Sequence, residues 1–158
     1  MARYNRWQNS SLYTAADALQ DAERKAARGA FFGSIHGTLN HLLWGARMWM
    51  HRLAGWPAPR PKSIRESVDY FEDWETLKQE RQSSDEAIIA WADELAPSML
   101  DGDLTWYSGA LGREVTKPRW VLIAHLFNHQ THHRGQVHWL LTQLGARPQD
   151  SDLPFMPE

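Results

Sequence analysis

Histidines near the C-terminal end are the residues of this 158-residue sequence best suited to chemistry. Five of the eight histidines lie in residues 124–138. Among them, His129 and His133 are four residues apart, so on a helix their imidazoles lie one above the other on the same face. An imidazole pair at this spacing can bind one metal ion, as the paired histidines of zinc-protease helices do. The spacing therefore predicts part of a metal site.

The face that carries this pair is the apolar face of its helix. At about 100° per residue, four leucines lie within roughly 60° of the His129 direction. Both imidazoles should therefore point into the core, where a polar group without partners is costly. A metal ion would supply those partners. The four residues are Leu122, Leu126, Leu140 and Leu144.

A catalytic zinc-type site combines three protein ligands with an open position. His41 is the best third candidate, because it lies on a second predicted helix, to one side of that helix's apolar stripe. His125, one turn before His129, is a competitor. The face of His41 is a seam of mostly small residues that would leave room for an ion or a ligand. The seam comprises Ser34, Thr38, His41, Gly45 and Met48.

The other histidines are weaker candidates on helix geometry. His36 and His51 share the predicted helix of His41 but point to other sides. His132 flanks the face of the pair and is expected next to the site rather than in it. His138 points away from His133 and is expected at the surface.

Periodic spacing of apolar residues predicts the elements that must position these side chains. Steps of three and four residues indicate four long helices, at about residues 3–19, 32–53, 73–96 and 118–144. Two short runs at 104–108 and 113–117 flank a Gly-Ala-Leu-Gly turn and indicate a hairpin. The predicted fold is all-α: a four-helix bundle with a short β-hairpin insert before the last helix, forming a single domain over residues 1–158.

Three further predictions concern segments outside the histidine motifs. Residues 79–86 are polar all round, so this part of the third long helix should be solvated. The tail, residues 146–158, should pack as an irregular strap or be loose. An exposed aromatic surface on the first helix would be a source of contacts for a homodimer.

Composition narrows the function classes. The net charge is −2 and no basic block exists, so nothing electrostatic points to nucleic acid. The absence of cysteine excludes thiolate metal ligands and a cysteine nucleophile. No apolar run reaches the ~20 residues of a membrane helix, and no signal peptide is visible, so the expected location is the cytoplasm without a membrane partner.

Two motifs, taken together, resemble the DinB-like (DinB/YfiT) family of metal-dependent proteins. They are GSIHGTLNHLLW at residues 33–44 and HLFNHQTHHRGQ at residues 125–136. The resemblance extends over about residues 4–145. It implies a four-helix bundle, often dimeric, in which a divalent metal is held by three histidines.

The resemblance also implies which residues are the ligands. One histidine comes from the second helix and two from an HxxxH pattern in the last, which here are His41, His129 and His133. This demotes His125. Some members carry an acidic residue shortly after the tryptophan of the first motif, whereas Ala46 stands in that region here.

Related families include transferases and isomerases that use small thiols such as bacillithiol or mycothiol. The leading hypothesis is therefore a metal-dependent transferase that uses a low-molecular-weight thiol to attack an electrophilic substrate. One alternative is a metal-dependent hydrolase, although no carboxylate neighbours the HxxxH pattern to act as a base. Another is a non-catalytic metal-binding protein of stress response or dimerisation. Three imidazoles suit zinc, nickel or iron.

Overall fold

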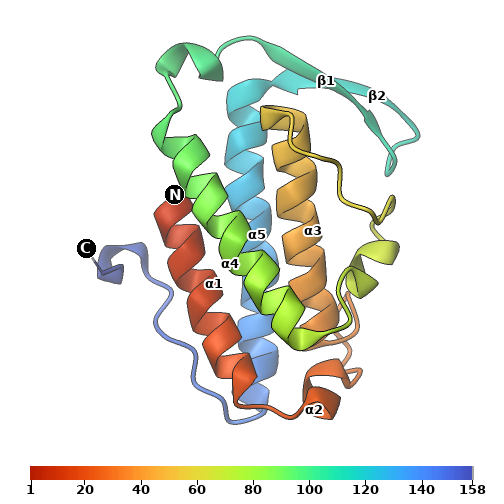
Figure 1. The fold of residues 1–158 in the computed structure, drawn as a ribbon, viewed down its shortest axis with the longest axis vertical. Helices are drawn as coiled ribbons and strands as arrows, with labels where there is room; N and C mark the ends of the chain where they lie inside the picture. The colour runs from red at the N-terminus through yellow and green to blue at the C-terminus, as the bar shows by residue number, and fades with distance from the viewer. Residues whose placement is uncertain (158) are drawn as a thin grey trace.

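The computed structural model describes residues 1–157, which form a mostly helical protein with one small antiparallel sheet (Figure 1). This confirms the helical class and the hairpin insert. No helix within these residues is long and apolar enough to span a membrane. The α-helices are α1 (Ala2–Asp17), α2 (Asp21–Lys25), α3 (Ile35–Ala54), α4 (Trp74–Asp93) and α5 (Arg119–Gln143). The 3-10 turns are η1 (Glu66–Asp69), η2 (Pro97–Leu100) and η3 (Leu153–Phe155).

Local sequence signals fix the ends of α3 and α4. The Ser34 hydroxyl accepts a hydrogen bond from the Gly37 amide and caps the start of α3. Gly55 ends α3 in the left-handed region, at φ 72°, where a residue without Cβ is favoured. Asp73 caps α4 in the same way as Ser34 caps α3, by accepting from the Thr76 amide.

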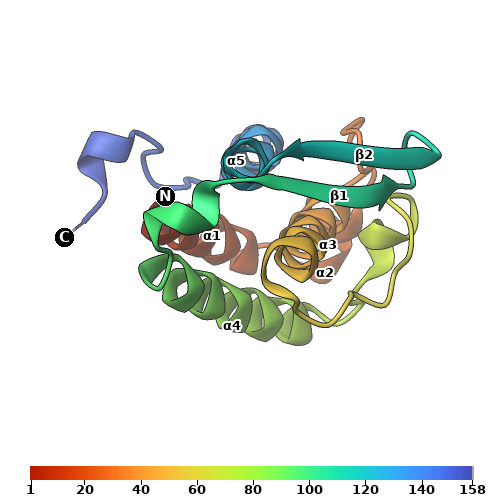
Figure 2. The same cartoon turned by 90° about the horizontal axis from the view of Figure 1, so that it is seen from above.

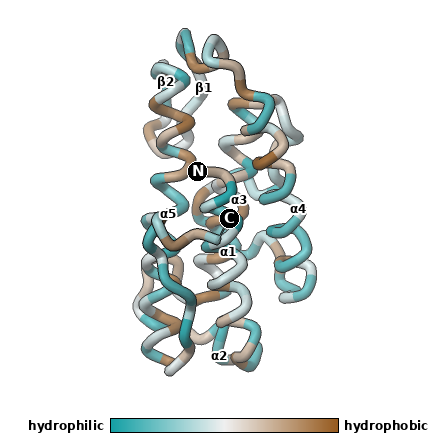
Figure 3. The backbone as a smooth tube through the Cα atoms, turned by 90° about the vertical axis from the view of Figure 1, so that its left-hand side faces the viewer, coloured by the Kyte–Doolittle hydropathy of each residue, from teal (hydrophilic) through white to brown (hydrophobic). Residues whose placement is uncertain are grey.

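The four long helices pack side by side (Figure 2). α1 contacts α4 and α5, and α3 contacts the same two helices. Apolar and polar residues alternate along the chain, as amphipathic helices require (Figure 3). The buried apolar residues form two clusters, one around Leu39, Leu77 and Leu140 and the other around Met50, Ile88 and Leu126.

A layer of buried polar residues lies between the two apolar clusters along α1, α4 and α5. Its centre is Asp85, which pairs with Arg81 at 2.7 Å and accepts hydrogen bonds from Asn5 and Asn9. Arg134 of α5 in turn donates to Asn5. These contacts satisfy most of the polar groups that the packing removes from water.

This layer corrects the expectation that residues 79–86 are solvated. Arg81 is 2 % exposed and Asp85 is 3 % exposed. The two lie at i and i+4, in line with the buried Leu77 and Ile88, so they share the face that α4 turns to the core. The charges are tolerated there because they are paired with each other and with amides of α1.

The predicted hairpin is confirmed. β1 (Asp103–Ser108) pairs antiparallel with β2 (Arg113–Pro118), and Trp106 lies opposite Val115. The strand β2 leads directly into α5, so Pro118 ends the strand and precedes the helix instead of occupying its first turn. Figure 2 shows the hairpin lying across one end of the helices.

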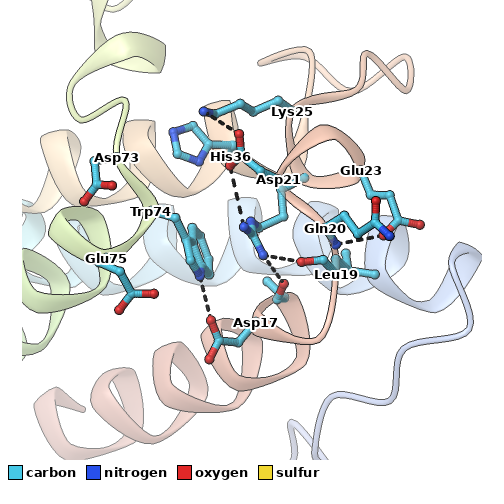
Figure 4. Close-up of polar contacts among 12 residues, drawn as sticks. Asp17, Leu19, Gln20, Asp21, Glu23, Lys25, His36, Asp73, Trp74 and Glu75 are labelled. Atoms are coloured by element: carbon cyan, nitrogen blue, oxygen red, sulfur yellow. Dashed lines mark hydrogen bonds and ion pairs between the residues drawn. The ribbon is translucent and has the colours of Figure 1, made fainter.

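The short α2 closes the opposite end, at the corner shown in Figure 4. The Trp74 indole N–H donates to Asp17 at 2.7 Å, which ties the start of α4 to the end of α1. The Glu23 carboxylate accepts a hydrogen bond from the Gln20 backbone amide at 2.8 Å at the start of α2. The Arg24 guanidinium of α2 lies over the Trp74 ring at 4.6 Å. The end of α1 and the short α2 therefore both contact this one indole.

The tail runs back along α1 as a strap (Figure 1), which is one of the two arrangements expected for it. The Tyr4 hydroxyl donates to the Ser151 carbonyl at 2.6 Å, and the Trp7 indole donates to Gln149 at 2.9 Å. Tyr4 and Tyr13 are buried and Trp7 is half-buried. The expectation of an exposed aromatic surface on the first helix is therefore wrong, because the core and the strap cover these rings.

Candidate metal centre

The packing of α3 against α5 brings three histidines together between these two helices. His41 projects from α3, and His129 and His133 project from α5. Each offers one ring nitrogen, and the three nitrogens lie within 4.8 Å of one another. The Nε2 atoms of His41 and His129 are 3.2 Å apart. Two chain segments 88 residues apart thus meet at one point.

Ser67 fixes the proton of His41. The Ser67 hydroxyl has a single hydrogen, which it donates to the Ile64 carbonyl at 2.6 Å. Its oxygen lies 2.8 Å from His41 Nδ1 and must therefore accept the hydrogen of that nitrogen. His41 Nε2 is left with a free lone pair facing the other two imidazoles.

Gln136 does the same for His133. Its side-chain oxygen Oε1 lies 2.8 Å from His133 Nδ1 and can only accept, so Nδ1 carries the hydrogen. The Nε2 atom of His133 is thereby the nitrogen with a free lone pair. A metal-binding imidazole commonly donates its second ring N–H to a carbonyl, carboxylate or water, and the two arrangements here are of that kind.

His129 is positioned by space rather than by a hydrogen bond. A Cβ placed on Gly45 would lie 3.1 Å from Cε1 of His129, so the ring occupies the room that this glycine leaves. The Nδ1 atom of His129 is buried and has no hydrogen-bond partner. The predicted small-residue seam of α3 therefore accommodates the opposing imidazole at Gly45.

Burial keeps the three imidazoles neutral. Burial, together with the neighbouring His129 and His133, lowers the pKa of His41 to about 3 from an ordinary 6.5. Burial likewise lowers the pKa of His129 to about 3, again helped by adjacent histidines. The pKa of His133 is lowered by burial and partly restored by its bond to Gln136. Neutral imidazoles are the form that binds a metal.

The geometry fits one small divalent ion. Two nitrogens about 2.1 Å from a common ion at a tetrahedral angle lie about 3.4 Å apart, close to the separation of His41 and His129. Two lone pairs facing each other repel unless a proton or a cation lies between them. The triad could therefore hold a metal ion.

The cavity beside the triad has a volume of about 530 Å³. His41 and His129 form part of its wall, and Trp44 and Trp49 of α3 form another part. Trp106 of β1 and the connection between α3 and α4 complete it. A larger hollow of about 760 Å³ lies between α1 and α4, away from the histidines, and its lining contains none of them.

The other histidines lie outside the triad. His125 is exposed, and its ring centre is 5.6 Å from that of His129. His132 is exposed and packs edge-on against His133. His36 bonds to the Phe71 carbonyl through Nε2, and His51 bonds to a backbone carbonyl through Nδ1. His138 is half-buried rather than fully at the surface.

Sequence reasoning missed two supports of the site. Ser67 lies in the segment between α3 and α4, where no periodicity predicts structure, so nothing in the sequence signals its role. Phe32 stacks on the His41 ring at 3.7 Å between centres from a position before the start of α3. Gln136 was detectable, because it stands three residues after His133 and therefore one turn away on the same side.

Comparison with known proteins identifies the family of the chain. No curated protein matches the chain. The family model described as the DinB family matches residues 1–158. Since the match covers the whole chain, the chain belongs to the DinB family.

Proposed function

We propose that the protein binds one divalent metal through His41, His129 and His133 and is a transferase that uses a low-molecular-weight thiol. The observation that carries the proposal is the convergence of three neutral imidazoles, two of which, His41 and His129, line a cavity. A site built for structure alone would be closed by a fourth protein ligand. Among the described residues, the cluster has three members.

The chain's own residues would prepare the reaction. His41 and His133 would present Nε2 because Ser67 and Gln136 hold the hydrogens of their Nδ1 atoms. Three neutral ligands would leave the dipositive charge uncompensated, and when bound the ion would supply Lewis-acid chemistry by favouring the deprotonated thiol. The tryptophans of the cavity would exclude water around an electrophilic substrate. The thiol would lose its proton to solvent, and the thiolate sulfur would form a bond to the electrophilic carbon of the substrate. The bond from that carbon to the leaving group would break, and the leaving group would depart with the electron pair.

Zinc, nickel and iron are the candidate metals. Three imidazoles and no thiolate give no strong preference among them. Affinity in vitro follows the Irving–Williams order and favours copper or nickel. We propose zinc or iron for the cell, because metal availability rather than affinity decides the occupant there.

A hydrolase is the weaker alternative. Such an enzyme would use a carboxylate as general base beside the metal, as the zinc proteases do. The described lining of the cavity contains no aspartate or glutamate. A non-catalytic metal-binding protein of stress response or dimerisation is the second alternative, and thiol binding separates it from a transferase.

Cobalt(II) substitution tests the proposal. Cobalt-loaded protein is titrated with 2-mercaptoethanol, and the charge-transfer absorption of a sulfur–cobalt bond is recorded. The proposal expects absorption that saturates with the thiol and is absent in His133→Ala. A cobalt spectrum that does not respond to any thiol would leave a metal-binding protein without transferase chemistry.

Architecture and assembly belong to the same proposal. We propose a single DinB-like domain that forms the family's four-helix bundle and associates as a homodimer. Light scattering coupled to size exclusion measures the mass directly. A mass of one chain at micromolar concentration would rule out the dimer without affecting the metal site.

A further inference from the structure

We infer that the cavity beside the triad takes a ligand that carries an anionic group, and that Arg52 is the residue that anchors this group. The inference rests on the proposed function only in placing the ligand next to the metal. Three observations support it: the positive charges of the cavity, the unused N–H donors of the Arg52 guanidinium, and the row of rings that connects Arg52 to the triad.

The charged side chains of the cavity all have one sign. Its lining includes Arg52, Lys62 and Arg65, and among the described residues it includes no aspartate or glutamate. None of the three takes part in an ion pair among the described residues. A concave site with charges of one sign raises the local concentration of ions of the opposite sign.

Arg52 is the best-placed of the three. Its guanidinium lies 4.7 Å from the centre of the Trp49 ring and 5.7 Å from that of Trp106. These two rings hold the group without using its N–H donors. The guanidinium hydrogen bonds among the described residues all come from other arginines. Burial lowers the pKa of Arg52, because part of its charge has been removed from water without a carboxylate to replace it.

A continuous wall of rings connects Arg52 to the triad. Trp49 contacts His125 with ring centres 5.0 Å apart, and His125 contacts His129 at 5.6 Å. A ligand with an anionic end at Arg52 and its reactive end at the triad would lie along this wall. Planar guanidinium binds carboxylate, phosphate or sulfonate through paired hydrogen bonds, which fixes the ligand's orientation as well as its affinity.

The larger hollow between α1 and α4 provides a contrast. It also has basic side chains, but three of its four, Arg3, Lys78 and Arg81, are paired with aspartates. Charge that is already compensated attracts little further anion. The uncompensated charge of Arg52 is therefore a property of the triad cavity and not of hollows in this protein generally.

The anionic group could belong to the thiol or to the electrophile, and the experiment separates the two. Cobalt-loaded protein is titrated with 3-mercaptopropionate and with its neutral isostere 3-mercaptopropionamide, with the sulfur–cobalt absorption as the measure of binding. Benzenesulfonate is titrated separately by calorimetry, with benzyl alcohol as its neutral partner. It is anionic but lacks a thiol and is a poor metal ligand, so its binding reports on the anion site alone.

The key variant is Arg52→Gln, and the matched control is Arg113→Gln, which removes an exposed positive charge from the hairpin outside the cavity. If the thiol carries the anion, 3-mercaptopropionate binds about tenfold more tightly than its amide, and Arg52→Gln abolishes the preference. If the electrophile carries it, the two thiols bind alike while benzenesulfonate binding depends on Arg52. Arg52→Lys should restore part of the preference, and Arg113→Gln should not change it.

Equal binding of anionic and neutral partners in both series would overturn the inference, even if Arg52→Gln fails to fold, because that comparison needs only the wild-type protein. The outcome is distinct from failure of the proposed function. Absence of any sulfur–cobalt absorption, together with Arg52-dependent binding of benzenesulfonate, would remove the thiol transferase and leave the anion site standing.

Discussion

Each imidazole of the triad is held by a different means. Ser67 fixes His41 through a hydrogen bond from another segment, whereas Gln136 fixes His133 from within the same helix. His129 has no such bond and depends on the space over Gly45. Neighbours that orient a metal ligand have measurable effects on affinity, so each support can be tested separately.

Replacing Ser67 by alanine should weaken metal binding roughly 10- to 100-fold. The change removes the acceptor that holds the hydrogen of His41 on Nδ1, so the ring can rotate and can adopt the other tautomer. The measurement is a competition titration of zinc against a chromophoric chelator. Ser83→Ala, at an exposed position on α4, is the control and should bind as the parent does. Unchanged affinity in Ser67→Ala would mean that the hydroxyl does not orient His41.

Replacing Gly45 by alanine should also weaken metal binding, by displacing the His129 ring. The new Cβ would lie 3.1 Å from Cε1, closer than ordinary van der Waals contact. Gly135→Ala is a matched control on α5, since a Cβ there meets no atom within 4 Å. Both changes raise helix propensity by about 1 kcal/mol, so a difference between them in zinc affinity reports on His129. Equal affinities would show that the ring does not need this space.

At the scale of elements, the candidate site lies where α3 packs against α5. Apolar residues spaced three and four positions apart predicted both helices. The faces of these helices predicted that His129 and His133 point inward. They also predicted that the seam around Gly45 faces a bulky group. Those features are encoded within single helices. Ser67 and Phe32 were not predictable, because they reach His41 from irregular segments whose course depends on the packing of the whole chain.

The polar segment of α4 shows the same limit. Its residues are hydrophilic one by one, and only the partners on α1 and α5 reveal that Arg81 and Asp85 are buried. Sequence periodicity counts apolar residues and therefore assigns a paired, buried charge to the surface.

Removing Asp85 should destabilise the protein by about 3–5 kcal/mol, because Arg81 would remain buried without its partner. The free energy of unfolding of Asp85→Ala, measured in urea on metal-free protein, checks this. Glu86→Ala, the adjacent exposed position, should stay within about 0.5 kcal/mol of the parent. A loss below about 1 kcal/mol in Asp85→Ala would mean that the buried layer contributes little to stability.

At the scale of the whole molecule, the neutral triad ties stability to pH. His41 and His129 have a pKa of about 3 in the folded protein, against 6.5 ordinarily. Between these values the unfolded chain binds protons that the folded chain does not. The contribution of these two histidines to the stability of metal-free protein should therefore be complete above about pH 6.5. The unfolding free energy should fall as the pH is lowered below that value.

Urea unfolding of metal-free protein at pH 7.5 and pH 5.5 measures this dependence. A His41→Gln/His129→Gln variant provides the comparison, because it lacks both titrating groups while keeping polar side chains. It should lose much less stability between the two pH values than the parent does. The same loss in parent and variant would assign the pH dependence to other groups.

The central claim is that these three histidines form a metal site, and metal content tests it most directly. Untagged protein is purified, and metal equivalents per chain are determined by elemental analysis for the parent, for His129→Ala and for His132→Ala. The last is the matched control, since His132 is an exposed histidine on the same helix, adjacent to His133. About one equivalent is expected in the parent and in His132→Ala, and little in His129→Ala. No metal in the parent, or a full equivalent retained by His129→Ala, would contradict it.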